Sequence, residues 1–202
     1  MKIFNLLSVV LLFSATAITQ QPSPSEDEAA AYTKTLNQRT AKIVATLEIP
    51  DTATAQKVQS IIVQQYRDLN AVHDVEKDAE KKEKQLKQLH QTYISKLSTL
   101  LNQQQVDKVK DGMTYNVFHV TYTAYQDMIP TLTDNQKSKI YEWLKEAREE
   151  AMDQGSSKDK HKVFGKYKGR INNYLSTEGY DLKKEEKAWQ ERLRKKREEN
   201  KG

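Results

Sequence analysis

The chain has 202 residues and no cysteine, which excludes disulfide bonds and thiol chemistry. Abundant Lys, Glu, Gln, Ala and Leu, with only 6 Gly and 4 Pro, predict an all-α protein. Residues 18–154 carry 17 basic and 20 acidic side chains, a balance of −3, whereas residues 155–202 carry 15 and 8, a balance of +7. We therefore expect an acidic partner to be drawn to the C-terminal quarter.

The first 17 residues have the pattern of a secretory signal peptide. Lys2 precedes an apolar run, Ile3 to Phe13, and a small-residue cleavage signal ends at Ala17. The run is too short for a membrane span, and a lipid-anchored lipoprotein would need a cysteine. We expect residues 1–17 to be a signal peptide of a periplasmic or secreted protein; a buried N-terminal helix is the alternative.

Residues 18–25 are predicted to be a flexible leader and residues 26–202 a single helical domain, an irregular bundle of about six to seven helices. The domain divides into N-terminal helices at 26–100 and a basic helical part at 101–202. Ser25 and Glu28 have the spacing of a capping box, so the first helix is expected at 26–47.

A charged gap at 73–85 interrupts the next apolar pattern. It is typical of either a solvated face of one long helix or a connection between two. We favour two helices, at 52–72 and 78–100, because one helix of some 50 residues would be about 75 Å long.

Two similar passages, "LNQQQVDKV" from Leu101 and "LTDNQKSKI" from Leu132, predict helix starts. Each places an N-cap residue three positions before a glutamine that can reach back to the cap amide. Between them, "DGMTYNVFHVTYTAYQDMIP" contains Gly112, which can end the preceding helix, and many aromatic and β-branched residues. We expect an aromatic-rich irregular segment near 112–119 and then a helix at about 119–129, largely buried or lining a pocket.

In the remaining chain, caps and apolar periodicity predict three helices, at 134–154, 158–176 and 182–198. The second contains "KHKVFGKYKGRINNYL", with two glycines that each cost about 1 kcal/mol relative to alanine. On a helical wheel the apolar residues form one face, and Gly165 and Gly169 lie on the opposite face with basic neighbours. Such a strip suits either close packing of another helix or a basic groove for an acidic sugar. The candidate ligand-binding residues are Lys162, Gly165, Lys166, Tyr167, Gly169, Arg170 and Asn173.

No motif in the chain names a reaction. The four histidines never have the spacing of a helical metal pair, and no nucleophile elbow or phosphate-binding glycine loop is present, so we predict no metal site, cofactor or catalytic residue. Glycoside cleavage needs only two opposed carboxylates, and Glu146, Glu149 and Asp153 share one predicted helix face. A solvated helix face is the better interpretation, but an enzyme stays an alternative.

Three passages, "VKDGMTY" at 109, "EAREEAMDQGSSKDKH" at 146 and "FGKYKGRINNYLSTEGYDL" at 164, resemble a family of exported Bacteroidetes proteins known only as a domain of unknown function. Members tend to lie near genes for plant polysaccharide breakdown, so the resemblance implies a role around imported glycans. It implies no activity and no catalytic residues. "LTDNQ" also resembles the short motif of the periplasmic chaperone Spy and the stress regulator CpxP.

We therefore expect a non-catalytic periplasmic protein whose basic C-terminal part binds a glycan-derived, acidic ligand or a protein partner. Nucleic acid and a membrane span in the mature chain are not expected. A Spy-like chaperone and a polysaccharide-active enzyme are the two alternatives, and the sequence does not indicate an oligomeric state.

Overall fold

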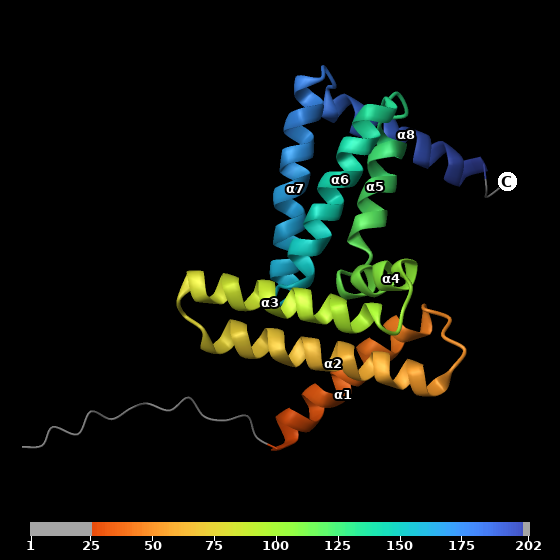
Figure 1. The fold of residues 1–202 in the computed structure, drawn as a ribbon. Coiled ribbons are helices and arrows are strands. Elements are labelled where there is room, and N and C mark those ends of the chain that lie inside the picture. The colour runs from red at the N-terminus through yellow and green to blue at the C-terminus, as the bar shows by residue number, and fades with distance from the viewer. Residues whose placement is uncertain (1–25, 200–202) are drawn as a thin grey trace, which may run out of the picture.

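The structure, a computed structural model, describes residues 26–199, and these form eight α-helices (Figure 1). The helices are α1 (Glu26–Ala45), α2 (Thr52–Val75), α3 (Ala79–Ser98), α4 (Gln103–Met113), α5 (Val117–Met128), α6 (Asp134–Met152), α7 (Ser157–Thr177) and α8 (Leu182–Glu199). The predicted all-α class is confirmed, with one or two helices more than expected. The predicted signal peptide, the leader and the Ser25 cap lie outside the described residues.

Side-chain caps explain where most of the helices begin. Asp51 accepts from the backbone amides that open α2, and Asp78 does the same for α3. Asn102 with Gln105, and Thr133 with Gln136, form complete capping boxes at the starts of α4 and α6. The two matching sequence passages are therefore helix starts, as predicted.

Helices α1 to α4 form the N-terminal part of the molecule. Helices α2 and α3 run antiparallel, joined by the short connection at 76–78, so the charged gap separates two helices as favoured. The four helices share one apolar core with Leu47, Ile62, Leu97 and Val109 at its centre. Because Val106, Val109 and Met113 belong to this core, the apolar face of α4 packs with the N-terminal helices, while Asp107, Lys110 and Asp111 contact α6.

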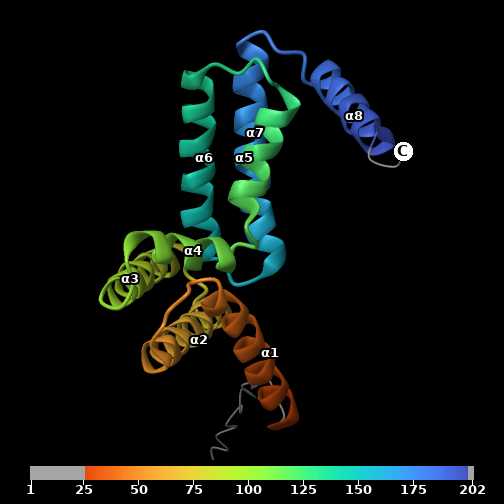
Figure 2. The ribbon, with the colours of Figure 1, turned by 90° about the vertical axis from the view of Figure 1, so that its right-hand side faces the viewer.

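Helices α5, α6 and α7 form a second bundle with its own core, around Phe118, Ile140, Leu144, Phe164 and Ile171. This bundle stands steeply across α2 and α3 (Figures 1 and 2). After Gly179, whose φ of +94° suits glycine, α8 turns back past the end of α5 and extends away from the bundle (Figure 2). None of its residues is fully buried.

The segment between the two cores is less irregular than the sequence suggests. Gly112 lies inside α4, and non-helical backbone is confined to Thr114, Tyr115 and Asn116. The β-branched and aromatic residues that favour extended structure are helical here because Phe118 and Tyr125 then fall on one face and enter the second core. Tertiary burial outweighs the local propensity.

Candidate functional site

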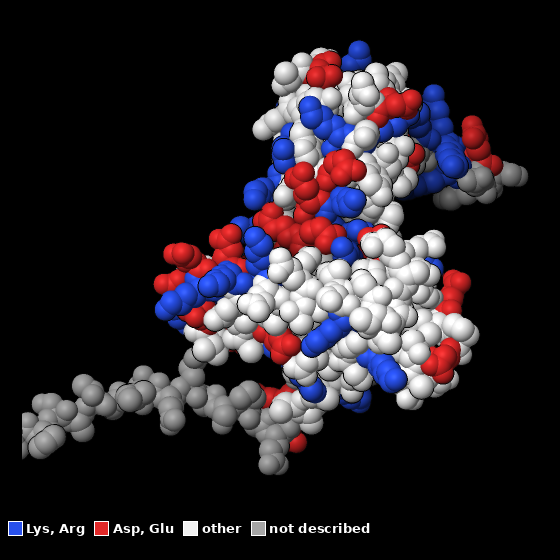
Figure 3. Space-filling view, in the orientation of Figure 1, with Lys and Arg blue, Asp and Glu red and all other residues white. Residues whose placement is uncertain are grey.

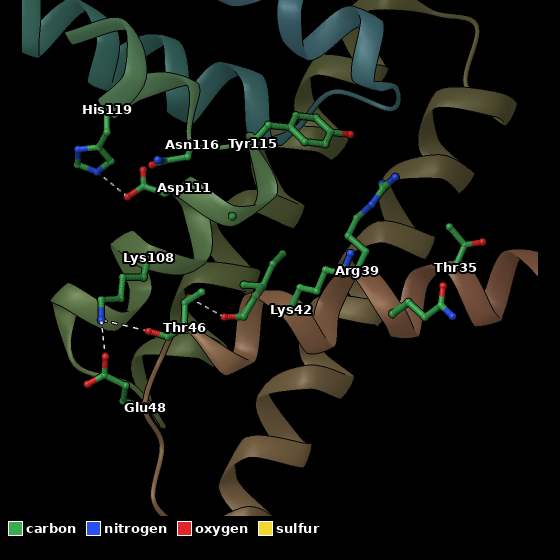
Figure 4. A pocket seen from close by; sticks show the side chains of 13 residues that line it. Thr35, Arg39, Lys42, Thr46, Glu48, Lys108, Asp111, Tyr115, Asn116 and His119 are labelled. Carbon is green, nitrogen blue, oxygen red and sulfur yellow. Dashed lines mark hydrogen bonds and ion pairs between the residues drawn. The ribbon is translucent and has the colours of Figure 1, made fainter. Parts of the chain in front are cut away.

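A groove of about 890 Å³ opens where the two halves of the chain meet (Figure 4). Helix α1 forms one wall, and the end of α4, the following turn and the start of α5 form the other. We call it the α1–α4 groove. Its lining residues are Thr35, Gln38, Arg39, Lys42, Ile43, Thr46, Glu48, Lys108, Asp111, Gly112, Tyr115, Asn116 and His119.

The groove is shaped by a close approach of α4 to α1 at Gly112. A Cβ atom added to Gly112 would lie 2.8 Å from Cγ1 of Ile43, a buried core side chain. Real Cβ atoms do not approach that closely, so only glycine allows the two helices to meet at this distance. The glycine that was expected to end the helix thus sets the floor of the groove.

The turn after α4 contains two consecutive non-glycine residues with left-handed backbone. The amide of Asn116 donates to the carbonyl of Asp111 at 2.8 Å, the bond that closes a Schellman turn. Tyr115 occupies the left-handed position where such turns usually have glycine, with φ of +58°, and Asn116 follows at +56°. The third non-glycine residue with positive φ, Glu48 at +54°, also lines this groove.

A bulky side chain in left-handed backbone costs about 1–3 kcal/mol and persists where the surroundings require it. Burial of the Tyr115 ring in a core does not offset this strain, because 41% of the residue is exposed. Beneath the turn, the buried Lys160 donates to the carbonyls of Met113 and Met152, at 3.2 Å each, and so ties α4, α6 and α7 together. Burial lowers the pKa of Lys160 to about 8.

The basic side chains of the groove differ in whether they have a carboxylate partner. Lys108 donates to the carbonyl of Thr46 at 3.1 Å and lies 3.7 Å from the carboxylate of Glu48. Arg39 and Lys42 are exposed on the opposite wall, and neither forms an ion pair with a carboxylate among residues 26–199. Arg39 lies instead over the ring of Tyr66, 5.6 Å from its centre. Two cations are thus free to meet an anionic ligand.

Asp111 organises the other wall of the groove. One carboxylate oxygen lies 2.9 Å from Nε2 of His119, and the other accepts from Arg148 at 2.8 Å. Arg148 is almost fully buried and also donates to Asp107 at 2.6 Å. The guanidinium therefore fixes the position of the Asp111 side chain, which in turn orients His119 beside Asn116 (Figure 4).

The acidic face of α6 belongs to a second ionic network that joins α3, α4 and α6. Glu149 accepts from Lys110 at 2.7 Å and lies 3.5 Å from Nε2 of His90, whose Nδ1 lies 2.8 Å from Asp153. Hydrogen bonds with Asp153 and Glu149 raise the pKa of His90 to about 9. Burial opposes ionisation of Glu149, but His90 and Lys110 together lower its pKa to about 2.

These pairings account for the three carboxylates considered for glycoside cleavage. Glu149 and Asp153 bind His90, and Glu146 accepts from Arg170 at 3.2 Å, so each carboxylate is engaged by a basic partner. In the part of the chain that the structure describes, no group of three His, Asp or Glu side chains is placed to hold a metal ion.

The residues predicted from the α7 pattern lie on an exposed surface, the glycine strip. Cβ atoms added to Gly165 and Gly169 would meet nothing within 4 Å, so no described helix covers the strip. Of its cations, Lys166 lies 3.5 Å from Glu150 and Arg170 pairs with Glu146 while stacking on Trp143. Tyr167 is half-buried beneath Lys166.

The strip's other members, Lys162 and Asn173, are exposed at its edges. The structure thus brings Lys166, Tyr167 and Arg170 together against α6 and leaves open space above the two glycines. The helix-packing interpretation of the glycines is wrong for the described residues, because the opposite α7 face alone is buried, through Val163, Phe164, Ile171 and Leu175.

Sequence reasoning missed the α1–α4 groove because its residues come from two segments, 35–48 and 108–119, that lie some 60 residues apart in the chain. One signal was present: "GMTYN" lacks glycine where a helix C-terminus usually has it, so a tyrosine or asparagine must adopt left-handed backbone. The eight-residue separation of Asp111 and His119 gives no helical pairing, and only the intervening turn brings them together.

The chain belongs to the family described as a protein of unknown function, DUF3826, whose model matches residues 33–83 and 72–195. No curated protein shows significant sequence similarity to the chain. Among the described residues, no helix is long and apolar enough to cross a membrane.

Proposed function

We propose that this member of the family is an exported, non-catalytic binding protein that holds an anionic, glycan-derived ligand in the α1–α4 groove. The observation that carries the proposal is that three residues line one groove: Arg39 and Lys42, which have no carboxylate partner among residues 26–199, and Tyr115, whose backbone is left-handed. A carboxylated sugar offers the anion for the cations and a ring face for the tyrosine.

The groove also suits such a ligand in size and polarity. Its volume of about 890 Å³ lies in the range of small-molecule sites, and Thr35, Gln38 and Asn116 add hydrogen-bonding groups to its walls. Export and a role in polysaccharide use are parts of the proposal that depend on the signal-peptide pattern and on the family resemblance to Bacteroidetes proteins.

Calorimetric titration of the protein with an acidic plant oligosaccharide, and with a neutral one of equal length, tests the proposal. We expect binding of the acidic sugar only, weakened by salt, because the interaction depends on exposed charges. Replacing both cations, Arg39→Gln with Lys42→Gln, should weaken binding at least about tenfold. Equal binding of the neutral sugar, or no binding of either, would contradict the proposal.

The chaperone alternative stays a prediction. Within the Spy-like passage "LTDNQ", Thr133 and Gln136 form the capping box of α6, and Gln136 also donates to Glu178. Suppression of aggregation of an unfolded client protein would measure that activity directly.

A further inference from the structure

A second groove lies between α5, α7 and α8, with a volume of about 340 Å³. We call it the α5–α8 groove. Its apolar walls come from α5, through Val120, Ala124 and Met128, and from α8, through Leu182 and Trp189. It is separate from the α1–α4 groove, and the two share no lining residue.

The apolar side chains of this groove are only partly covered by the rest of the chain. Val120 is 62% exposed, and none of the α8 residues is fully buried. The indole nitrogen of Trp189 is out of contact with solvent and has no hydrogen-bond partner among the described residues. An exposed valine beside the half-buried side chains of Leu182 and Trp189 thus lines a concavity, which is typical of a surface that a partner desolvates.

Helix α8 is nevertheless held in a defined place. Arg192 donates to the carbonyls of Asp127 and Met128, at 2.7 and 3.1 Å, and so caps the C-terminal end of α5. Tyr125 donates to Asn172 at 2.7 Å across the α5–α7 side of the groove. The groove is therefore formed before any partner arrives, which lowers the entropic cost of binding.

The surroundings of the groove are basic. Lys168 and Lys183 line it, against one acidic lining residue, Glu186. Beyond Arg192 the helix continues with Arg194, Lys195, Lys196 and Arg197, four exposed cations that form no ion pair among residues 26–199. Figure 3 shows basic side chains along this arm, with acidic side chains beside them.

We infer that the α5–α8 groove docks an acidic amphipathic helix of a protein partner. Apolar side chains of the partner would lie between Val120 and Trp189, and its carboxylates would face Lys168, Lys183 and the basic end of α8. The concave shape favours a helix with projecting side chains over a flat anionic lipid surface. This interaction is independent of the sugar site proposed above.

Fluorescence of Trp189 in a Trp143→Phe background reports occupation of the groove, since the chain has 2 Trp. The probes are two synthetic helical peptides of about 15 residues with the same leucines at i, i+3, i+4 and i+7. One peptide has glutamate at the other positions and the second has lysine. We expect saturable binding of the acidic peptide, weaker at high salt, and none of the basic peptide.

The matched variants are Val120→Glu in the groove and Val75→Glu at the end of α2, since both valines are well exposed. Val120→Glu should weaken binding of the acidic peptide at least about tenfold, and Val75→Glu should leave it unchanged. Circular dichroism checks that both variants stay folded.

Equal binding of both peptides, binding of neither, or an equal effect of both valine variants would overturn the inference. So would a Trp189 response to anionic phosphatidylglycerol vesicles without a response to the acidic peptide, which would assign the surface to a membrane.

Discussion

The α1–α4 groove and the glycine strip are both basic and exposed, but they differ in how their charges and backbone are used. On the strip, Lys166 and Arg170 pair with glutamates of α6, and the backbone is relaxed helix with open space above Gly165 and Gly169. In the groove, Arg39 and Lys42 have no carboxylate partner among residues 26–199, and Tyr115 has strained backbone. Lys162 of the strip also forms no ion pair among these residues, so retained strain in a concave lining, and not unpaired charge alone, marks the better candidate site.

The largest expected difference between the two surfaces concerns their arginines. Arg148→Met removes the buried partner of Asp111 and Asp107, leaving charge without compensation behind the groove, and should cost about 3–5 kcal/mol of unfolding free energy. Arg170→Met breaks an exposed ion pair and the stacking on Trp143, and should cost less than about 2 kcal/mol. Urea denaturation measures both, and equal losses would mean that Arg148 is not a structural support of the groove.

The ionic network behind the groove predicts a specific pH dependence. The pKa of His90 is about 9 in the folded protein against an ordinary value of 6.5, so its stabilisation is complete below pH 6.5 and is lost as the pH rises through 9. The loss should be at most about 3 kcal/mol, and His90→Gln should abolish this part of the pH dependence.

Denaturation of both proteins at pH 6 and pH 9.5 checks the network. The folded pKa of Glu149 is depressed to about 2, so its contribution is lost only in acid, as the pH falls from 4.5 through 2. The pKa of Lys160, lowered to about 8, makes both proteins gain stability as the pH rises above 8, so the contribution of His90 is the difference between the two proteins. If the free energy of unfolding of His90→Gln fell by the same amount between pH 6 and pH 9.5, a group other than His90 would be responsible for the pH dependence.

The glycines of the two surfaces should respond to alanine in opposite directions. Gly112→Ala forces Ile43 to move and should destabilise the protein by about 1–2 kcal/mol. Gly165→Ala and Gly169→Ala meet open space in a helix and should each stabilise it by up to about 1 kcal/mol. Thermal unfolding measures the three variants, and destabilisation by the strip alanines would show that a contact missing from the structure covers the strip.

The contrast between these glycines also shows how far the sequence could predict the fold and the site. Helix positions followed from caps such as Asn102 and Thr133 and from the charged gap, because these signals act over a few residues. The α7 core face followed from periodicity alone. The role of Gly112 could not be predicted, because it depends on Ile43, which approaches from a helix some 70 residues earlier in the chain. Likewise, sequence composition marks a lysine as basic but does not show whether a glutamate on the next helix neutralises it.

The smallest stability effect is expected at the strained turn. Tyr115→Gly places the usual residue in left-handed backbone and should stabilise the protein by about 1 kcal/mol, while removing the aromatic ring from the groove. Higher stability together with weaker binding of an acidic oligosaccharide would indicate that the strain is retained for the ligand. Unchanged binding would remove Tyr115 from the site.

The most direct test of the central claim compares two charge-reversed proteins in one calorimetric titration with an acidic plant oligosaccharide. One protein has Arg39→Glu with Lys42→Glu in the α1–α4 groove, and the other has Lys162→Glu with Lys166→Glu at the glycine strip, so the change in net charge is the same. We expect the groove variant to lose binding and the strip variant to keep the affinity of the unmodified protein within about twofold. Loss of binding in the strip variant alone would contradict the assignment and return the site to α7.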